Sequence, residues 1–344
     1  MRIASARRIL PLLAVLLALS AGASAQSGAG TLDIYWIDVE GGGATLVIAP
    51  TGESMLLDVG WPRPEGRDAR RIAAVMEEAG LEKLDYMLIT HFHTDHVGSL
   101  RELADLVPID HYLDHGGETE ERNQQWRDLY LEVAGDARMV ASAGDRMSLG
   151  DVDVLMISSN MELIEETLND GGPNPLCADA ERRPPASAEN QRTLGALFTF
   201  AGFTFVDLGD LDWDMEMKLS CPVNRLGTVS LYQTSRHGAF DGAGAPAHLY
   251  AMRPQVVVVN NGPRKGITAP HMYDRITAVP DIEGIWQTHL ALEAEGHNTD
   301  DDMIANFEDT DDCQGHWLRA SVSPDGTFTM TNGRNGYSRT YTVR

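Results

Sequence analysis

The chain has 344 residues, of which 43% are hydrophobic and 23% are charged. This composition is ordinary for a globular protein and excludes collagen, coiled coils and long disordered proteins. The 51 acidic residues outnumber the 27 basic ones, which gives a formal net charge of −24. A surface of that sign repels long nucleic acids and anionic membranes.

The first 25 residues have the pattern of a secretory signal peptide. Basic residues precede an apolar run at 9–19, and Ala23-Ser24-Ala25 forms an A-x-A cleavage site before Gln26. The apolar run is too short to span a hydrocarbon core of about 30 Å. The pair Arg7-Arg8 weakly resembles a twin-arginine signal, so the sequence leaves the Sec and Tat export routes open. We expect an exported protein, periplasmic or secreted, with no membrane span after cleavage.

Hydrophobic patterns predict an alternation of strands and helices in the first half of the mature chain. Strands are expected at 31–38, 44–49, 55–58, 84–90, 109–113 and 152–157, and helices at 67–79, 99–106 and 118–133. The clearest helix is 67–79, where Ile72, Val75, Met76 and Ala79 recur at spacings of three and four. Gly80 supplies its stop signal.

Residues 160–190 separate the two halves of the chain. They have no usable period and collect glycine and proline, so we expect a loop insertion that acts as a functional loop or lid, or else is disordered. After this loop, strands are expected at 193–200, 203–208, 229–233, 256–259 and 285–288, a helix at 245–252 and a hairpin at 317–331. Two blocks of strands, each with helices, predict an α/β fold of two packed sheets with helices outside, in a single domain over 26–344.

The chain has three cysteines, Cys177, Cys221 and Cys313, which lie far apart in the sequence. In an oxidising compartment they predict one disulfide and one free thiol. The sequence does not separate the three possible pairings.

The strongest motif is the run His91-Phe92-His93-Thr94-Asp95-His96, directly after the apolar strand at 84–90. Because His91 and His93 are two residues apart on extended backbone, their imidazoles are expected to point the same way. Asp95 and His96 offer two further ligands from the following loop. This density of imidazole and carboxylate suits zinc, with manganese or iron as alternatives.

The motif resembles the H-x-H-x-D-H signature of the metallo-β-lactamase superfamily, and the resemblance runs over roughly residues 31–290. Asp58 matches the family's early aspartate, Asp210 matches the aspartate that bridges two metals, and His237 matches the last histidine, in the same order along the chain. The resemblance implies an αββα four-layer sandwich with two mixed β-sheets and, in each chain, two Zn²⁺ ions. The implied metal ligands are His91, His93, Asp95, His96, Asp210 and His237.

The same resemblance assigns a role to each ligand. His91 and His93 would hold one metal, Asp95, His96 and His237 the other, and Asp210 would lie between them. Asp210 and Asp95 would also be catalytic, the first by holding the metal pair and the second by orienting the attacking hydroxide. Asp58 would accept a hydrogen bond from a ligand imidazole and fix its tautomer.

One histidine of the family pattern is missing between His96 and Asp210. His111 and His115 both come too early in the chain for the usual place. Asn190 is nearer to that place, although an amide oxygen is a poorer zinc ligand than an imidazole. Asn190 and His115 are therefore the candidates for the extra ligand.

Three segments look like the hydrolase domain of ComEC-type DNA-uptake proteins, which are thought to cut phosphodiesters. These segments are residues 37–44, the run Asn190-Gln191-Arg192-Thr193-Leu194, and Arg236-His237-Gly238. Those domains have a His-His-Gly loop, and this chain has Arg236 in place of its first histidine, which makes His237, in the second place, the expected ligand. The chain also lacks the membrane channel of those proteins.

A basic loop follows the strand at 256–259. Arg264 and Lys265 are adjacent cations in an acidic chain and could hold a phosphate or carboxylate. Asn261 and His271 complete the set of candidate substrate-binding residues. The alternative is a solvated turn, because the loop also contains proline and glycine.

These observations predict an exported metal-dependent hydrolase of a phosphodiester or another phosphate ester. The alternatives are a lactone or β-lactam ring hydrolase on the same site, and a non-catalytic binding module that kept the fold. The acidic charge favours a small or short anionic substrate over long nucleic acid. The sequence does not indicate an oligomeric state.

Overall fold

The computed structural model describes residues 30–267, 270–310 and 312–344. The expected signal peptide at 1–25 lies outside the described residues. Among the helices of the described ranges, none is both long and apolar enough to cross a membrane.

The first sheet has nine strands, antiparallel at one side and parallel at the other. Their order is β19 (Ser338–Thr342), β18 (Thr327–Asn332), β17 (Leu318–Val322), β1 (Leu32–Trp36), β2 (Thr45–Ile48), β3 (Ser54–Leu57), β4 (Leu84–Leu88), β5 (Ile109–Asp114) and β6 (Arg138–Val140). The strands from β3 to β6 are parallel to one another.

The second sheet is also mixed. Its order is β16 (Gly284–Gln287), β15 (Val256–Val259), β14 (Leu231–Gln233), β12 (Phe203–Asp207), β11 (Gly195–Phe200), β8 (Val152–Ser159) and β7 (Arg146–Leu149), with β9 (Glu162–Leu163) paired to β8. The strands from β12 to β16 are parallel, and the others are antiparallel. A separate two-stranded ribbon pairs β10 (Gly172–Pro173) with β13 (Val223–Asn224).

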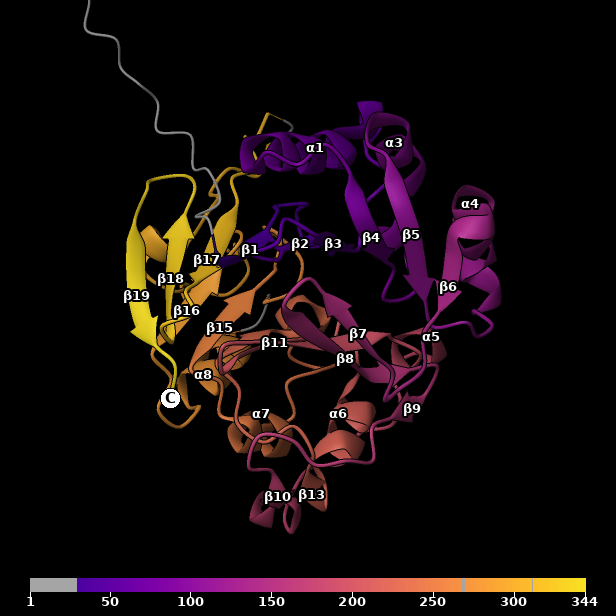
Figure 1. Cartoon of the computed structure of the whole chain (residues 1–344). Helices are drawn as coiled ribbons and strands as arrows, with labels where there is room; N and C mark the ends of the chain where they lie inside the picture. The colour runs from indigo at the N-terminus through magenta and orange to yellow at the C-terminus, as the bar shows by residue number, and fades with distance from the viewer. Residues whose placement is uncertain (1–29, 268–269, 311) are drawn as a thin grey trace, which may run out of the picture.

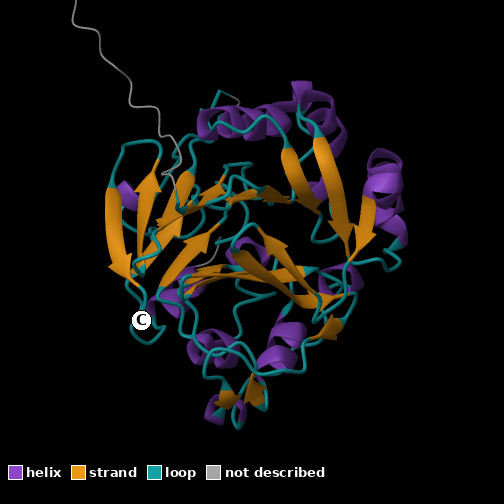
Figure 2. Cartoon of the chain, in the orientation of Figure 1, coloured by secondary structure: helices purple, strands orange, loops and turns teal. Residues whose placement is uncertain are grey.

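Helices cover the outer faces of both sheets (Figures 1 and 2). The helices are α1 (Arg67–Ala79), α2 (Thr94–Val97), α3 (Leu100–Leu106), α4 (Gln124–Ala134), α5 (Ala188–Gln191), α6 (Trp213–Ser220), α7 (Pro246–Met252) and α8 (Pro270–Thr277). In Figure 1, α1 and α3 lie above the first sheet, and α6 and α7 lie below the second. The prediction of an αββα sandwich with two mixed sheets and helices outside is confirmed.

Side-chain alternation along the strands explains the layers. Ile34 and Trp36 on β1 join the buried core between the two sheets, whereas Tyr35 joins the outer core beneath α1 and α3. The Trp36 ring meets Phe205 of the second sheet edge-on, with 5.5 Å between the ring centroids. A third core packs the second sheet against α6, α7 and α8. Because successive side chains of a strand point to opposite faces, and both faces are covered, each sheet has two buried faces.

Two local predictions need correction. The helix expected at 118–133 begins only at Gln124, because Glu120 is extended and its carboxylate accepts hydrogen bonds from Ser187 Oγ and Glu189 N. The helix α6 was not predicted, since it is buried on nearly all sides and shows no helical period of apolar residues.

The segment 160–190 forms short elements instead of one continuous coil. It contains β9, β10, a 3₁₀ turn at Pro175–Cys177 and most of α5. A disulfide joins Cys177 to Cys221 at the end of α6, and Cys313 is a free, buried thiol. The structure thus selects one of the three pairings that the sequence left open.

Candidate metal centre

The predicted ligands lie where parallel strands end. Asp58 follows β3, the run from His91 to His96 follows β4, Asp210 follows β12, and His237 follows β14. The carboxyl ends of parallel strands meet at one edge of a sheet, where ligands commonly bind. The two sheets place these edges together, so that residues up to 146 positions apart form one buried cluster.

The first part of the cluster contains His91, His93 and Asp210, whose ligand atoms lie within 4.8 Å of one another. His91 Nε2 is 2.9 Å from His93 Nδ1 and 4.0 Å from Asp210 Oδ2. His91 Nδ1 is 3.0 Å from Thr90 Oγ1, which turns the Nε2 atom toward the cluster.

The second part contains Asp95, His96 and His237 and meets the first at Asp210. The Nε2 atoms of His96 and His237 are each 3.3 Å from Asp95 Oδ2. The same nitrogens are 3.3 Å and 3.2 Å from Asp210 Oδ1. Asp210 therefore faces both groups of ligands, with one carboxylate oxygen nearer to each.

Asp58 supports the cluster from behind. Its Oδ2 lies 2.6 Å from His96 Nδ1, so His96 donates there and its Nε2 faces the other ligands. Thr90 donates to Asp58 from both its backbone N–H and its hydroxyl, each at 2.8 Å. Thr90 was not predicted, because a lone threonine at a strand end carries no sequence signal of this contact.

The glycine turn before β2 closes over the same site. A Cβ atom on Gly43 would lie 2.7 Å from Asp58 Oδ2 and 2.9 Å from His96 Nδ1. Gly43 N also donates to Asp95 O at 3.0 Å. Only glycine permits this close approach of backbone to the ligand side chains.

The protonation states suit a cation. Burial lowers the pKa of His91 well below its ordinary value, and the neighbouring His96 and His93 lower it further. Burial alone would raise the pKa of Asp210, but His237 and His96 hold it well below its ordinary value. Burial alone would lower the pKa of His96, but Asp95, Asp58 and Asp210 raise it well above its ordinary value, so a metal would have to displace a proton from this imidazole.

Unpartnered atoms also fit a bound metal. His96 Nε2, His237 Nε2 and Asp210 Oδ1 are buried and have no hydrogen-bond partner. Such atoms are rare in folded proteins and call for a ligand or ion. Imidazole nitrogens and carboxylate oxygens in two groups of three match the donors that zinc, manganese or iron take.

The two candidates for the extra ligand lie in different surroundings. His115 packs its ring against Phe92, and its buried Nε2 lies 3.6 Å from Glu189 Oε1 and has no hydrogen-bond partner. Asn190 is buried, and its Oδ1 has no hydrogen-bond partner. Its neighbours bind the strand end that carries the motif, since Glu189 accepts from Phe92 N at 2.7 Å and Leu194 N donates to Thr90 O at 2.8 Å.

Glu189 is a buried residue that the sequence analysis missed. Besides Phe92 N, its carboxylate accepts from the Thr119 hydroxyl at 2.6 Å. It thereby fixes the backbone between His91 and His93. In a chain with 51 acidic residues, nothing in the local sequence separates this carboxylate from those on the surface.

The basic loop divides between the cluster and the surface. Lys265 forms an ion pair with Asp95 and lies 4.6 Å from the centre of the Trp61 ring. Arg264 is mostly exposed and pairs with Asp309 at 2.7 Å and Glu293 at 3.7 Å. A pocket of about 490 Å³ opens here, and its walls include Trp61, Lys265 and Arg264.

The other two candidates of this group lie elsewhere. The buried Asn261 side chain donates to two backbone carbonyls, those of Gly262 and His289. His271 lies in α8, and its ring contacts the ring of Phe240. Neither residue lines the pocket beside Lys265, and the buried Asn261 Oδ1 has no hydrogen-bond partner.

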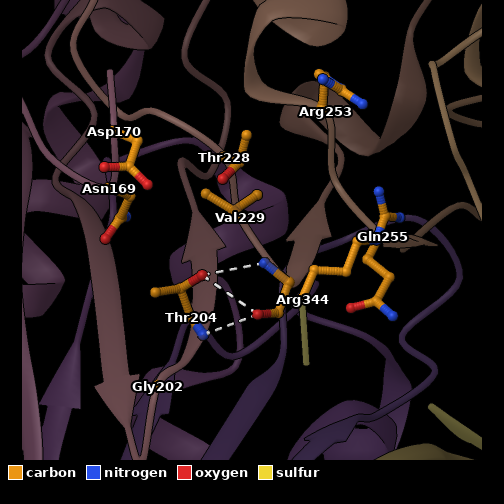
Figure 3. Close-up of a pocket in the computed structure, with 10 residues that line it drawn as sticks. Asn169, Asp170, Gly202, Thr204, Thr228, Val229, Arg253, Gln255 and Arg344 are labelled. Carbon is orange, nitrogen blue, oxygen red and sulfur yellow. Dashed lines mark hydrogen bonds between the residues drawn. The ribbon is translucent and has the colours of Figure 1, made fainter. Parts of the chain in front are cut away.

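A second pocket, of about 390 Å³, lies at the opposite end of the second sheet (Figure 3). It is formed at the amino ends of β12, β14 and β15 by residues that include Thr204, Ser230, Gln255 and Arg253. Thr204 and Ser230 bond to each other through backbone and side-chain atoms. Arg253 is paired with Asp281.

Comparison with known proteins agrees with this architecture. Residues 38–175 match the family model described as the metallo-beta-lactamase superfamily, a range that includes the histidine motif and ends before Asp210. No curated protein matches the sequence.

Solved structures match at low sequence identity. The metallo-beta-lactamase fold protein YhfI from Bacillus subtilis is 11% identical, with 75% of this chain and 96% of that chain covered and a TM-score of 0.47. Igni18, a metallo hydrolase from Ignicoccus hospitalis, is 13% identical, with coverages of 74% and 94% and a TM-score of 0.43. CmlA, a diiron β-hydroxylase from Streptomyces venezuelae, is 14% identical, with coverages of 67% and 45% and a TM-score of 0.38. The family match therefore covers residues 38–175, and the two mixed sheets with helices outside are consistent with it.

Proposed function

We propose that this protein is a metal-dependent hydrolase that holds two divalent ions between its two sheets. The observation that carries the proposal is the convergence of six ligand side chains with buried, unpartnered nitrogen and oxygen atoms. His91, His93 and Asp210 would hold one ion, and Asp95, His96 and His237 the other, with Asp210 shared. Zinc is the first choice for this donor set, with manganese or iron as alternatives.

The ions would act as Lewis acids and lower the pKa of a water molecule toward neutrality. The residues of the chain then have separate tasks. Asp210 keeps the two groups of ligands at a fixed separation, and Asp58 holds His96 in the tautomer that presents Nε2. Asp95 can accept a hydrogen bond from the attacking nucleophile and so orient it.

We propose a short anionic ester as the substrate, with a phosphodiester first. Lys265 supports this choice because it lines the pocket and contacts Asp95, so it lies between the substrate's entry and the ligands. Arg264 can contribute less, since two carboxylates already neutralise it. The similarity of three segments to ComEC-type hydrolase domains supports the same class of substrate. The signal-like residues 1–25 and the disulfide support export as the setting.

The test is hydrolysis of bis(p-nitrophenyl) phosphate by purified protein loaded with zinc or manganese, together with metal content. Asp210→Ala should lower turnover by about 10³-fold or more, because the shared ligand is lost. Arg253→Ala, at the far pocket, is the matched control and should keep wild-type turnover.

Other outcomes would favour the alternatives. Metal-loaded protein that ignores the phosphodiester but opens a lactone or β-lactam ring would contradict the phosphoesterase proposal and retain the hydrolase. Protein that binds less than one metal ion per chain would contradict both and favour a non-catalytic binding module.

A further inference from the structure

A second group of metal-binding side chains lies outside the candidate metal centre. Asp38, His289 and Cys313 each offer a ligand atom, and the three atoms lie within 4.8 Å of one another. They come from the loop after β1, the loop after β16 and the segment before β17. All three side chains are buried, and none belongs to the six ligands described above.

The donors differ in chemistry and together suit zinc. A thiolate, an imidazole and a carboxylate are the three kinds of side chain that bind zinc in proteins. Cys313 is the chain's free thiol, because Cys177 and Cys221 form the disulfide. A tetrahedral ion takes a fourth donor, and Asn306 Oδ1 lies 3.9 Å from Cys313 Sγ.

The charge balance of the cluster leaves room for a cation. The buried cluster holds one carboxyl group, that of Asp38, and one free thiol, that of Cys313. Arg71 faces Asp38, with Nη1 3.5 Å from Oδ2, but its shortest bonds go to the backbone carbonyls of Asp38 and Cys313. A divalent ion would compensate both a carboxylate and a thiolate here.

The surroundings of His289 match those of a metal ligand. Its two ring nitrogens are each 3.2 Å from a backbone carbonyl oxygen, those of Leu290 and Glu308. A neutral imidazole has one N–H and can donate to only one of these oxygens, so the other nitrogen keeps a lone pair that a metal ion could take while the N–H orients the ring.

We propose that Asp38, His289 and Cys313 bind a structural zinc ion, as a third metal site of this protein. The ion joins the loop at 38–43 to the segment at 306–313. The first of these reaches the candidate metal centre through Gly43, and the second carries Asp309, which pairs with Arg264 at the pocket. The site therefore fixes one wall of the substrate pocket, and it does not depend on the proposed hydrolase activity.

The test is titration of the purified, metal-free protein with cobalt(II) while the disulfide is intact. A thiolate bound to cobalt gives a charge-transfer band that nitrogen and oxygen ligands do not give. Since Cys313 is the free thiol, the band can only report this site. We expect the band to appear and to saturate by three cobalt per chain, the number of proposed sites, and its absence at all cobalt ratios would overturn the proposal.

Variants separate this site from the candidate metal centre. Cys313→Ser should remove the band and one bound cobalt, whereas Asp210→Ala should keep the band. His289→Gln retains the thiol. In this variant the dissociation constant for the cobalt that produces the band should rise by tenfold or more. A band that persists unchanged in His289→Gln would exclude His289 as a ligand and contradict the site.

A measurement on the wild type covers the case in which variants fail to fold. Alkylation of Cys313 by iodoacetamide should be at least tenfold slower with zinc bound than in metal-free protein of the same circular dichroism. Equal rates in the two states would mean that zinc does not reach the thiol.

Discussion

The two ends of the second sheet hold polar side chains in opposite states. At the carboxyl ends of β12 and β14, Asp210 and His237 have buried atoms without hydrogen-bond partners. At the amino ends, Thr204 and Ser230 bond to each other, and Arg253 is paired with Asp281, although Gln255 Oε1 lacks a partner. The pockets at the two ends are similar in volume, at about 490 and 390 Å³.

The two ends differ in the hydrogen bonding of their polar atoms and not in pocket volume. Pocket volume alone therefore does not indicate which end of the sheet carries the candidate site. Buried polar atoms normally find partners, because leaving one unpaired costs roughly 1–3 kcal/mol. A cluster whose ligand atoms lack hydrogen-bond partners is therefore stabilised by a cation that binds them. The following predictions test whether partnered and unpartnered groups behave as this comparison requires.

The largest expected effect concerns Glu216, a buried carboxylate that has partners. It accepts from Gly244 N at 3.1 Å and Ala245 N at 2.9 Å, and burial nevertheless raises its pKa to about 7. Between the unfolded value of 4.5 and about 7, the unfolded chain binds fewer protons than the folded one. The free energy of unfolding should therefore fall as pH rises through this window, by at most about 3 kcal/mol.

Chemical denaturation of wild type and Glu216→Gln between pH 5 and pH 8 measures this effect. The variant should have the smaller pH slope. Part of the slope should remain, because burial also raises the pKa of Asp207 to about 7. Identical slopes in the two proteins would show that the folded protein does not keep Glu216 protonated over this pH range.

The next effect concerns the support of the unpartnered end. Asp58→Asn removes the charge that holds His96 Nδ1, so we expect metal affinity to fall by about 10–100-fold. Asp85→Asn is the matched control, because Asp85 lies at the other end of the parallel strands and accepts from Ser54 N at 2.8 Å. Competition with a chromogenic chelator measures both variants. Equal losses in the two would contradict a specific role of Asp58.

A smaller effect should distinguish two adjacent cations. Lys265→Met should raise KM for an anionic substrate by about tenfold, because an ionic contact of roughly 1.4 kcal/mol is lost. Arg264→Met should change KM less than twofold, since Asp309 and Glu293 already neutralise Arg264. Steady-state kinetics of both variants measures this difference. An equal rise in KM would show that both cations bind the anion, and would contradict a specific role of Lys265.

The smallest effect on activity is expected at the far pocket. Ser230→Ala removes the hydroxyl that accepts from Thr204 N at 3.2 Å, and should lower the free energy of unfolding by about 1 kcal/mol. Turnover should change less than twofold. Loss of turnover in a folded variant would mean that the two ends of the sheet are coupled.

The sequence predicted those parts of the fold and site that have a local signal. The helix at 67–79 was predicted with its observed bounds, because its apolar period and Gly80 lie within the element itself. The short strands β6 and β7 were missed because three or four residues are too few to show a period, and the amphipathic helix α8 was also missed. The run from His91 to His96 was visible as six neighbouring residues, whereas Asp210 and His237 were placed only by resemblance to a family.

The contacts that complete the site depend on the folded chain. Glu189 reaches Phe92 across 97 positions, and Lys265 reaches Asp95 across 170. No local pattern encodes such distances. For the same reason, the pairing of Cys177 with Cys221 could not be chosen from three cysteines spread over the sequence.

On the proposed function, the ion pair between Lys265 and Asp95 couples the binding of the metal ion to the binding of the anionic substrate. An anion that draws Lys265 away leaves the Asp95 carboxylate with its full charge for a cation. Each ligand then raises the affinity of the other by the same factor, as thermodynamic linkage requires. A metal dissociation constant for this protein is therefore a property of the buffer anion as well as of the metal.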